Sequence, residues 1–154
     1  MAETYTFGDS AQSPSATITL SALAASTGRV SAQLDRGSGF APAWFTWRFN
    51  YGLNGSNIVG ASVGLYLATS DGTSVDGAVG TADAAVSTVE FLRALQLVGS
   101  TSVYQTTTNT KMTHSGYLFV PWRYISAAVW NFTTLPFQNS TSVHQLILTS
   151  FDMP

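Results

Sequence analysis

Charged side chains are scarce in this chain. Only 9% of its 154 residues are Asp, Glu, Lys or Arg, against roughly 25% in an ordinary soluble domain. The six Lys and Arg residues are spread between Arg29 and Arg123, and the formal net charge is −2. Binding to nucleic acid requires a concentrated positive surface, so we expect no nucleic-acid partner.

Cysteine is absent, which excludes a disulfide framework and thiolate chemistry. No apolar run approaches the roughly 18 residues of a membrane-spanning helix, so we expect no membrane partner. The segment Met1 to Phe7 has neither the basic nor the apolar region of a secretory signal, and we expect none. The missing cysteines fit a protein that is made for a reducing compartment, or one that is stable without disulfides.

Small hydroxyl side chains take the place of charge, since 39 of the residues are Ser or Thr. Hydrophobic residues make up 45% of the chain, which is enough for a core at this length. A surface of hydroxyls and small side chains repels itself only weakly. Such a surface suits a protein that functions packed against other proteins.

Alternation of apolar and polar residues is the dominant pattern, and it is typical of strands. It predicts strands within residues 16–20, 30–34, 44–51, 59–67, 103–112, 117–120, 123–132 and 143–151. Turn residues stand at 37–39, 53–57, 69–83 and 135–136, with Asn54-Gly55 a frequent hairpin turn. Residues 84–97 fit either a short helix or an extended segment.

The polar segment 1–14 is expected to be an extended arm, and residues 15–154 a single β-sandwich domain. About eight strands with closely spaced turns indicate an all-β, antiparallel, jelly-roll-like sandwich with at most one short helix. Such an arm could reach a neighbouring subunit and add a strand to its sheet.

Three local motifs could suggest chemistry, and each has a simpler structural interpretation. Residues 60–64 match G-x-S-x-G, but the alternation continues through them, whereas a nucleophile needs a sharp turn before a helix. Two histidines, His114 and His144, are too few for a metal site, which usually has three or more ligands. The Asp-Gly pairs at 71–72 and 76–77 lack calcium-loop spacing and are typical of turns.

A pair of catalytic carboxylates would have to come from Asp35, Asp83 and Glu90, which are scattered and stand beside turn residues or Arg. We therefore predict no catalytic, cofactor-binding or metal-binding residue, no cofactor and no enzymatic activity.

The aromatic run at residues 44–51 is the feature that most resembles a site. Alternation predicts that one face of it, formed by Phe45, Trp47, Phe49 and Tyr51, lines the sandwich core. Trp44 and Arg48 lie on the opposite face. Because Trp and Arg are frequent at the centres of interfaces, this pair is a candidate exposed contact.

The pattern in residues 58–154 resembles a known family. A loop with Ser70-Asp71-Gly72 and Asp76-Gly77 precedes an amphipathic segment at 92–97 and a Thr-rich strand. The strand Trp122-Arg123-Tyr124-Ile125-Ser126 then leads into Val129-Trp130-Asn131-Phe132, and Leu146-Ile147-Leu148-Thr149 ends the domain. This order is similar to that of the jelly-roll head decoration, or cement, proteins of tailed bacteriophages.

The resemblance implies a non-enzymatic structural protein on the exterior of a virion. Such proteins bind the outer surface of the major capsid protein, often as homo-oligomers (dimers or trimers), and stabilise the shell. The candidate interface residues are Tyr5 and Phe7 in the arm, together with Trp44, Arg48, Trp122 and Trp130. Two alternatives stay open: a carbohydrate-binding β-sandwich module, and a tail or baseplate structural protein.

Overall fold

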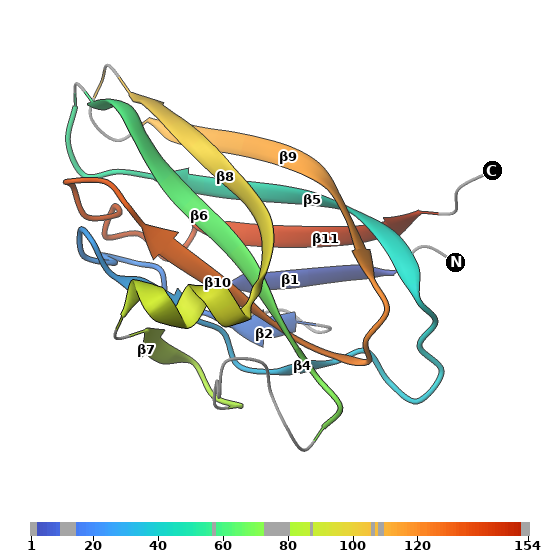
Figure 1. The fold of residues 1–154 in the computed structure, drawn as a ribbon. Coiled ribbons are helices and arrows are strands. Elements are labelled where there is room, and N and C mark those ends of the chain that lie inside the picture. Colours follow the sequence, from blue (N-terminus) through green and yellow to red (C-terminus); the bar gives the residue numbers. More distant parts are fainter. Residues whose placement is uncertain are drawn as a thin grey trace.

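The computed structural model of the chain is an all-β sandwich of two packed sheets (Figure 1). It describes residues 3–9, 15–56, 58–72, 81–86, 88–105, 107 and 110–151. The described residues contain eleven strands and one 3-10 helix, η2 (Val89–Ala94). Because that helix has only six residues, none in this part of the chain could cross a bilayer.

Sheet A has five strands in the spatial order β2-β1-β11-β5-β9. Their bounds are β1 (Thr4–Gly8), β2 (Ser15–Thr17), β5 (Ala43–Gly52), β9 (Lys111–Val120) and β11 (Gln145–Phe151).

Sheet B has the order β7-β3-β10-β6-β8, with β4 also paired to β10. Its bounds are β3 (Gly28–Val30), β4 (Leu34–Asp35), β6 (Ile58–Ser70), β7 (Ala84–Val86), β8 (Gln96–Gln105) and β10 (Tyr124–Asn131).

Eight of these strands form a jelly roll, and β2, β4 and β7 are short additions. The pairs are nested along the chain: β1 with β11, β3 with β10, β5 with β9, and β6 with β8, all antiparallel. The first and third pairs belong to sheet A and the other two to sheet B. A chain folded back on itself and wrapped into two sheets in this way has the jelly-roll topology, as expected from about eight strands with closely spaced turns.

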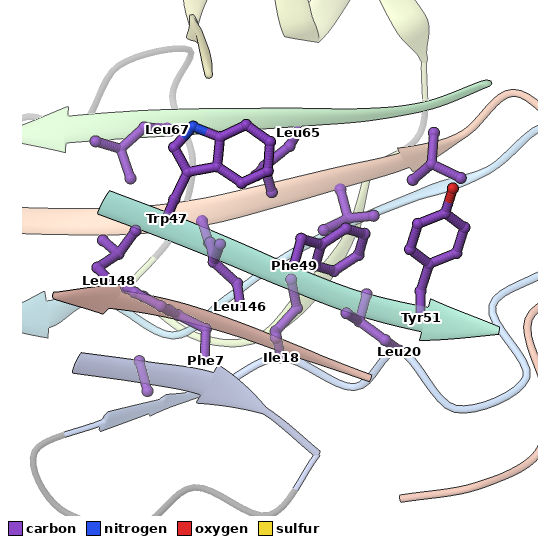
Figure 2. Packing of buried hydrophobic residues seen from close by; sticks show 14 of the residues in the cluster. Phe7, Ile18, Leu20, Trp47, Phe49, Tyr51, Leu65, Leu67, Leu146 and Leu148 are labelled. Atoms are coloured by element: carbon purple, nitrogen blue, oxygen red, sulfur yellow. The ribbon is translucent and has the colours of Figure 1, made fainter. Parts of the chain in front are cut away.

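The core fills the layer between the two inner faces, where β5 contributes the largest side chains (Figure 2). Phe45, Phe49 and Tyr51 are fully buried and Trp47 nearly so, which confirms the predicted inward face of the aromatic run. The Trp47 ring packs against a glycine in each of the two sheets, Gly116 on β9 and Gly99 on β8. A Cβ on Gly99 or Gly116 would lie within 3 Å of that ring, so these two glycines let the indole fit between β8 and β9.

For residues 4–8 the structure corrects the expectation of an arm. They form β1, which pairs with β11 on one side and with β2 on the other. Tyr5 and Phe7 are 5% and 0% exposed and belong to the core. The segment is polar overall because Thr4 and Thr6 occupy its outward positions. Of the other expected arm residues, Glu3 and Asp9 flank β1, and 1–2 and 10–14 lie outside the described part of the chain.

Other boundaries differ from the predicted ones. Residues 103–112 span the end of β8 and the start of β9, and residues 117–120 are the second half of β9. The ambiguous segment 84–97 contains β7, η2 and the first residues of β8. Residues 53–56 follow β5 and precede β6, and these two strands belong to different sheets, so the predicted turn is a corner and not a hairpin; residue 57 lies outside the described part of the chain. The G-x-S-x-G residues lie within β6, as predicted.

Candidate interaction surfaces

The outer face of sheet A carries a cluster of aromatic rings, here called the aromatic face. It consists of Trp44 on β5, Tyr117 and Phe119 on β9, and Phe151 on β11. Strand register brings them together, since Trp44 is paired with Phe119 on one side and with Phe151 on the other. The ring centroids of Trp44 and Phe119 are 5.5 Å apart, and those of Tyr117 and Phe151 5.9 Å. Tyr117 is 70% exposed, so its ring is available to a partner.

A shallow pocket of about 340 Å³ adjoins Tyr117 between β5 and β9. Four of its residues are exposed: Thr46, Arg48, Ser115 and Tyr117. The remaining lining comes from Trp47 and its register partner Gly116. Alternation therefore places hydroxyl groups, a guanidinium and an aromatic ring around one depression on the outer surface.

This pocket lies on a sheet without carboxylates. The five described strands of sheet A contain no Asp or Glu and two cations, Arg48 and Lys111. The exposed guanidinium of Arg48 makes no ion pair with a described residue. The outer face of sheet A is thus weakly positive, although the whole chain carries a net negative charge.

A buried arginine organises the end of the sandwich next to the aromatic face. The side chain of Arg36 is 0% exposed. Its Nη1 donates to the carbonyl oxygens of Val120 and Trp122, at 3.2 and 3.0 Å. Its Nη2 donates to the Ala41 carbonyl at 2.7 Å and to Glu3 Oε2 at 3.3 Å. Arg36 therefore ties its own connection, between β4 and β5, to the connection between β9 and β10 and to the first described residue of the chain.

Aromatic side chains complete the surroundings of Arg36. Its guanidinium lies over the rings of Phe40 and Phe45, at 5.4 and 5.1 Å from their centroids. Such cation–π contacts compensate in part for the loss of water around a buried charge. Glu3 also accepts a hydrogen bond from the Tyr5 hydroxyl at 2.9 Å. Burial first, and the Glu3 carboxylate second, raise the pKa of Tyr5.

The outer face of sheet B presents a second apolar surface, here called the helix face. It consists of Tyr66 on β6, Val89 on η2, Leu97 on β8 and Phe132 just after β10. Leu97 is paired with Tyr66, and a Cβ on Gly64 would touch the rings of both Tyr66 and Phe132. Leu97 is 59% exposed, and Val89 and Phe132 about 40%. The surface is therefore continuous around Tyr66.

A small pocket of about 230 Å³ lies within the helix face, lined by Tyr66, Val89, Leu92 and Arg93. Beneath this face, a second hydrophobic cluster holds η2 on the sheet. Its buried members are Val30, Ala68, Val86, Leu92, Leu95, Ala128 and Trp130. Because the sheets pack inner face to inner face, the helix face and the aromatic face lie on opposite sides of the sandwich (Figure 1).

The structure separates the six candidate interface residues. Trp44 and Arg48 lie on the outer face of sheet A, the side on which they were expected. Trp122 is 47% exposed in the connection held by Arg36. Trp130 is 7% exposed and its ring contacts Phe132 on the helix face. Tyr5 and Phe7, as described above, are core residues, so their proposed place in an interface is corrected.

Sequence reasoning missed several exposed residues, although a signal for some of them was present. Tyr117 and Phe119 alternate with the buried Leu118 and Val120, so the period of two already placed them outward. The exposure of Leu97 had no such signal, since a register shift in the β6–β8 pairing falls beside it.

The three candidate carboxylates lie on different elements, with Asp35 on β4, Asp83 directly before β7 and Glu90 on η2. Asp35 forms two 2.7 Å hydrogen bonds with Arg123, and Asp83 one with Arg29. Burial alone would raise the pKa of Asp83, but hydrogen bonds from Arg29 and Thr19, with the charge of Arg29, hold it below its ordinary value. Such pairing gives both aspartates a structural role.

The two histidines lie in different surroundings. His144 is fully buried, and its Nε2–H donates to the Gln138 carbonyl at 3.0 Å. A carbonyl oxygen can only accept, so the hydrogen resides on Nε2. Burial lowers the pKa of both His144 and His114. Within the described ranges, no three His, Cys, Asp or Glu side chains converge as metal ligands would, and Asp76 lies outside those ranges.

No protein-family model matches the chain, and no curated protein matches it.

Proposed function

We propose that the chain is a non-enzymatic structural protein of a tailed-phage virion. In this proposal it decorates the exterior of the capsid, binds the outer surface of the major capsid protein and stabilises the shell. It is made in the host cytoplasm and binds as a dimer or trimer. The jelly roll supports this proposal at the level of the fold, because virus capsid domains often use it, but lectins use it too. The choice between them depends on the surfaces.

The observation that carries the proposal is the helix face. Leu97, Val89 and Phe132 expose large apolar side chains around Tyr66, and polar residues such as Ser100 and Ser102 continue the same side of β8. Exposed apolar patches with polar surroundings mark protein-binding sites. The adjoining 230 Å³ pocket gives a partner side chain a place to insert.

Low charge also supports a docking role for this surface. The four residues that define the helix face are uncharged, and Glu90 and Arg93 on η2 have opposite signs. Interfaces are likewise depleted of charge at their centres, with charged groups at the rim. Repetition strengthens the attachment of an oligomeric decoration protein, because its copies bind to equivalent positions on one shell at the same time.

The test is binding to capsid shells that lack this chain, measured by co-sedimentation with increasing amounts of purified protein. We expect the wild-type chain to saturate the shells, and Leu97→Glu to bind about 100-fold more weakly because an unpaired carboxylate would be buried. Tyr117→Glu, the same change on the opposite side of the sandwich, should bind as the wild type does. If Leu97→Glu bound normally, the helix face would be the wrong surface. If the wild-type chain did not bind, the proposed function would be wrong.

A further inference from the structure

The outer face of sheet A differs in chemistry from the helix face. The helix face combines apolar side chains with few polar groups, whereas the pocket beside Tyr117 combines a ring with two hydroxyl groups and a guanidinium. Small-molecule sites typically join apolar walls to a few polar groups that fix orientation. Their volumes start at about 300 Å³, and this pocket measures about 340 Å³. The pocket therefore suits a small polar ligand better than an apolar protein segment.

The rings of the aromatic face fit a ligand with one apolar side. Tyr117 is the most exposed of the large hydrophobic side chains in the described residues, and it lies at the junction of the aromatic face and the pocket. An exposed ring offers a flat apolar surface with little conformational entropy to lose. The C–H side of a pyranose has the complementary shape and polarity, while its hydroxyl groups need hydrogen-bond partners.

Polar groups for such a ring surround the pocket. Beyond the strand pairing of their backbones, Arg48 and Ser115 make no side-chain hydrogen bond within the described residues. Thr46 donates a long bond of 3.3 Å to the Thr149 carbonyl, which leaves its hydroxyl oxygen able to accept. Donors and acceptors therefore lie around the ring of Tyr117 at the separations that adjacent strands impose.

Charge narrows the class of ligand further. Arg48 is a guanidinium without an ion-pair partner among the described residues, and the described strands of its sheet contain no carboxylate and one other cation, Lys111. A guanidinium binds a carboxylate through two parallel hydrogen bonds. A sugar that carries a carboxylate would satisfy Arg48, and no acidic side chain on the described strands of this sheet would repel it.

We propose that the pocket between β5 and β9 binds an acidic saccharide, with its carboxylate on Arg48 and its C–H face on Tyr117. This goes beyond the proposed structural function and does not depend on it, because the helix face lies on the other side of the sandwich. In a decorated shell, the sheet turned away from the capsid would then present a saccharide site.

The probe is trigalacturonate, titrated into the full chain by calorimetry and by amide NMR. A neutral galactose trimer with the same linkages serves as the comparison ligand. We expect trigalacturonate to bind with amide shifts centred on residues 46–48 and 115–117, and raised salt to weaken it. Arg48→Gln should weaken trigalacturonate about 10-fold and leave the neutral trimer unchanged, whereas Tyr117→Ala should weaken both. Arg93→Gln, the matched change on η2, should have no effect.

Three results would overturn the proposal. The first is no binding of trigalacturonate at roughly 10 mM, a concentration that detects even very weak sites. The second is equal loss with Arg48→Gln and Arg93→Gln, which would mean that Arg48 does not hold the carboxylate. The third is equal or tighter binding of the neutral trimer or of an acidic peptide such as triglutamate. Both substituted arginines are exposed, so the variants should fold, and circular dichroism verifies this.

Discussion

Replacing Phe7 by alanine measures how far β1 belongs to the core. Phe7 is fully buried, and its register partners are Leu146 on β11 and Ala16 on β2. A buried aromatic side chain removes roughly 150–250 Å² from water, which at roughly 25 cal/mol per Å² corresponds to roughly 4–6 kcal/mol. Alanine keeps the Cβ contacts, and buried Phe→Ala changes cost about 3–5 kcal/mol. We expect the free energy of unfolding to fall by about 4 kcal/mol.

Equilibrium urea unfolding, followed by tryptophan fluorescence, measures this loss. With an m-value of about 2 kcal/mol per M, the midpoint should fall by about 2 M. Thr6→Ala is the matched control, because Thr6 lies on the same strand and points outward. It should change stability by less than about 0.5 kcal/mol. If Phe7→Ala shifted the midpoint no more than Thr6→Ala, β1 would be a peripheral strand, and the assignment of Phe7 to the core would be refuted.

Two further variants test the buried polar groups. Arg36→Gln leaves several carbonyl oxygens without a donor and should lower the free energy of unfolding by about 3 kcal/mol, whereas the exposed Arg93→Gln should not; equal midpoints in urea would show that Arg36 does not hold the connections. Burial lowers the pKa of His144 in the folded chain, so that as the pH falls the unfolded chain binds a proton at this histidine at a higher pH than the folded chain does. The free energy of unfolding should therefore decrease as the pH drops below about 6.5. His144→Gln should reduce this fall in urea midpoints between pH 7 and pH 5, leaving the part due to His114; an unchanged slope would contradict the assignment.

The core of the fold could be predicted because it depends on local alternation. Side chains on a strand point alternately to the two faces, so the run at residues 44–51 specified both its strand and its buried face without reference to any partner. The same rule supports the interpretation of residues 60–64 as part of a strand, because alternation continues through them.

Strand boundaries and pairings were harder to predict because they depend on distant residues. The segment 103–112 reads as one strand, since its threonines favour extended structure and it has no Gly or Pro to mark the turn. The Asn54-Gly55 turn specifies a reversal of direction but not which strands pair. Likewise β1 is short and half polar, so only its place between β2 and β11 makes it a core strand.

The candidate site could be predicted only in part. Sequence alternation placed Trp44 and Arg48 on one outward face. Their neighbours Phe119 and Phe151 come from strands about 75 and 107 positions later in the chain, and are set beside Trp44 by long-range register, which local patterns do not contain. The weakly positive charge of sheet A could not be predicted either, because it depends on which five strands form that sheet.

The most direct test of the proposed decoration function is the copy number of this chain in purified virions. Quantitative mass spectrometry would compare it with the major capsid protein of the same particles. A decoration protein should be present in hundreds of copies per particle, in a fixed ratio to the capsid protein. A few to a few dozen copies would contradict a shell position and indicate the tail or baseplate, and absence from the particles would contradict a virion protein of any kind.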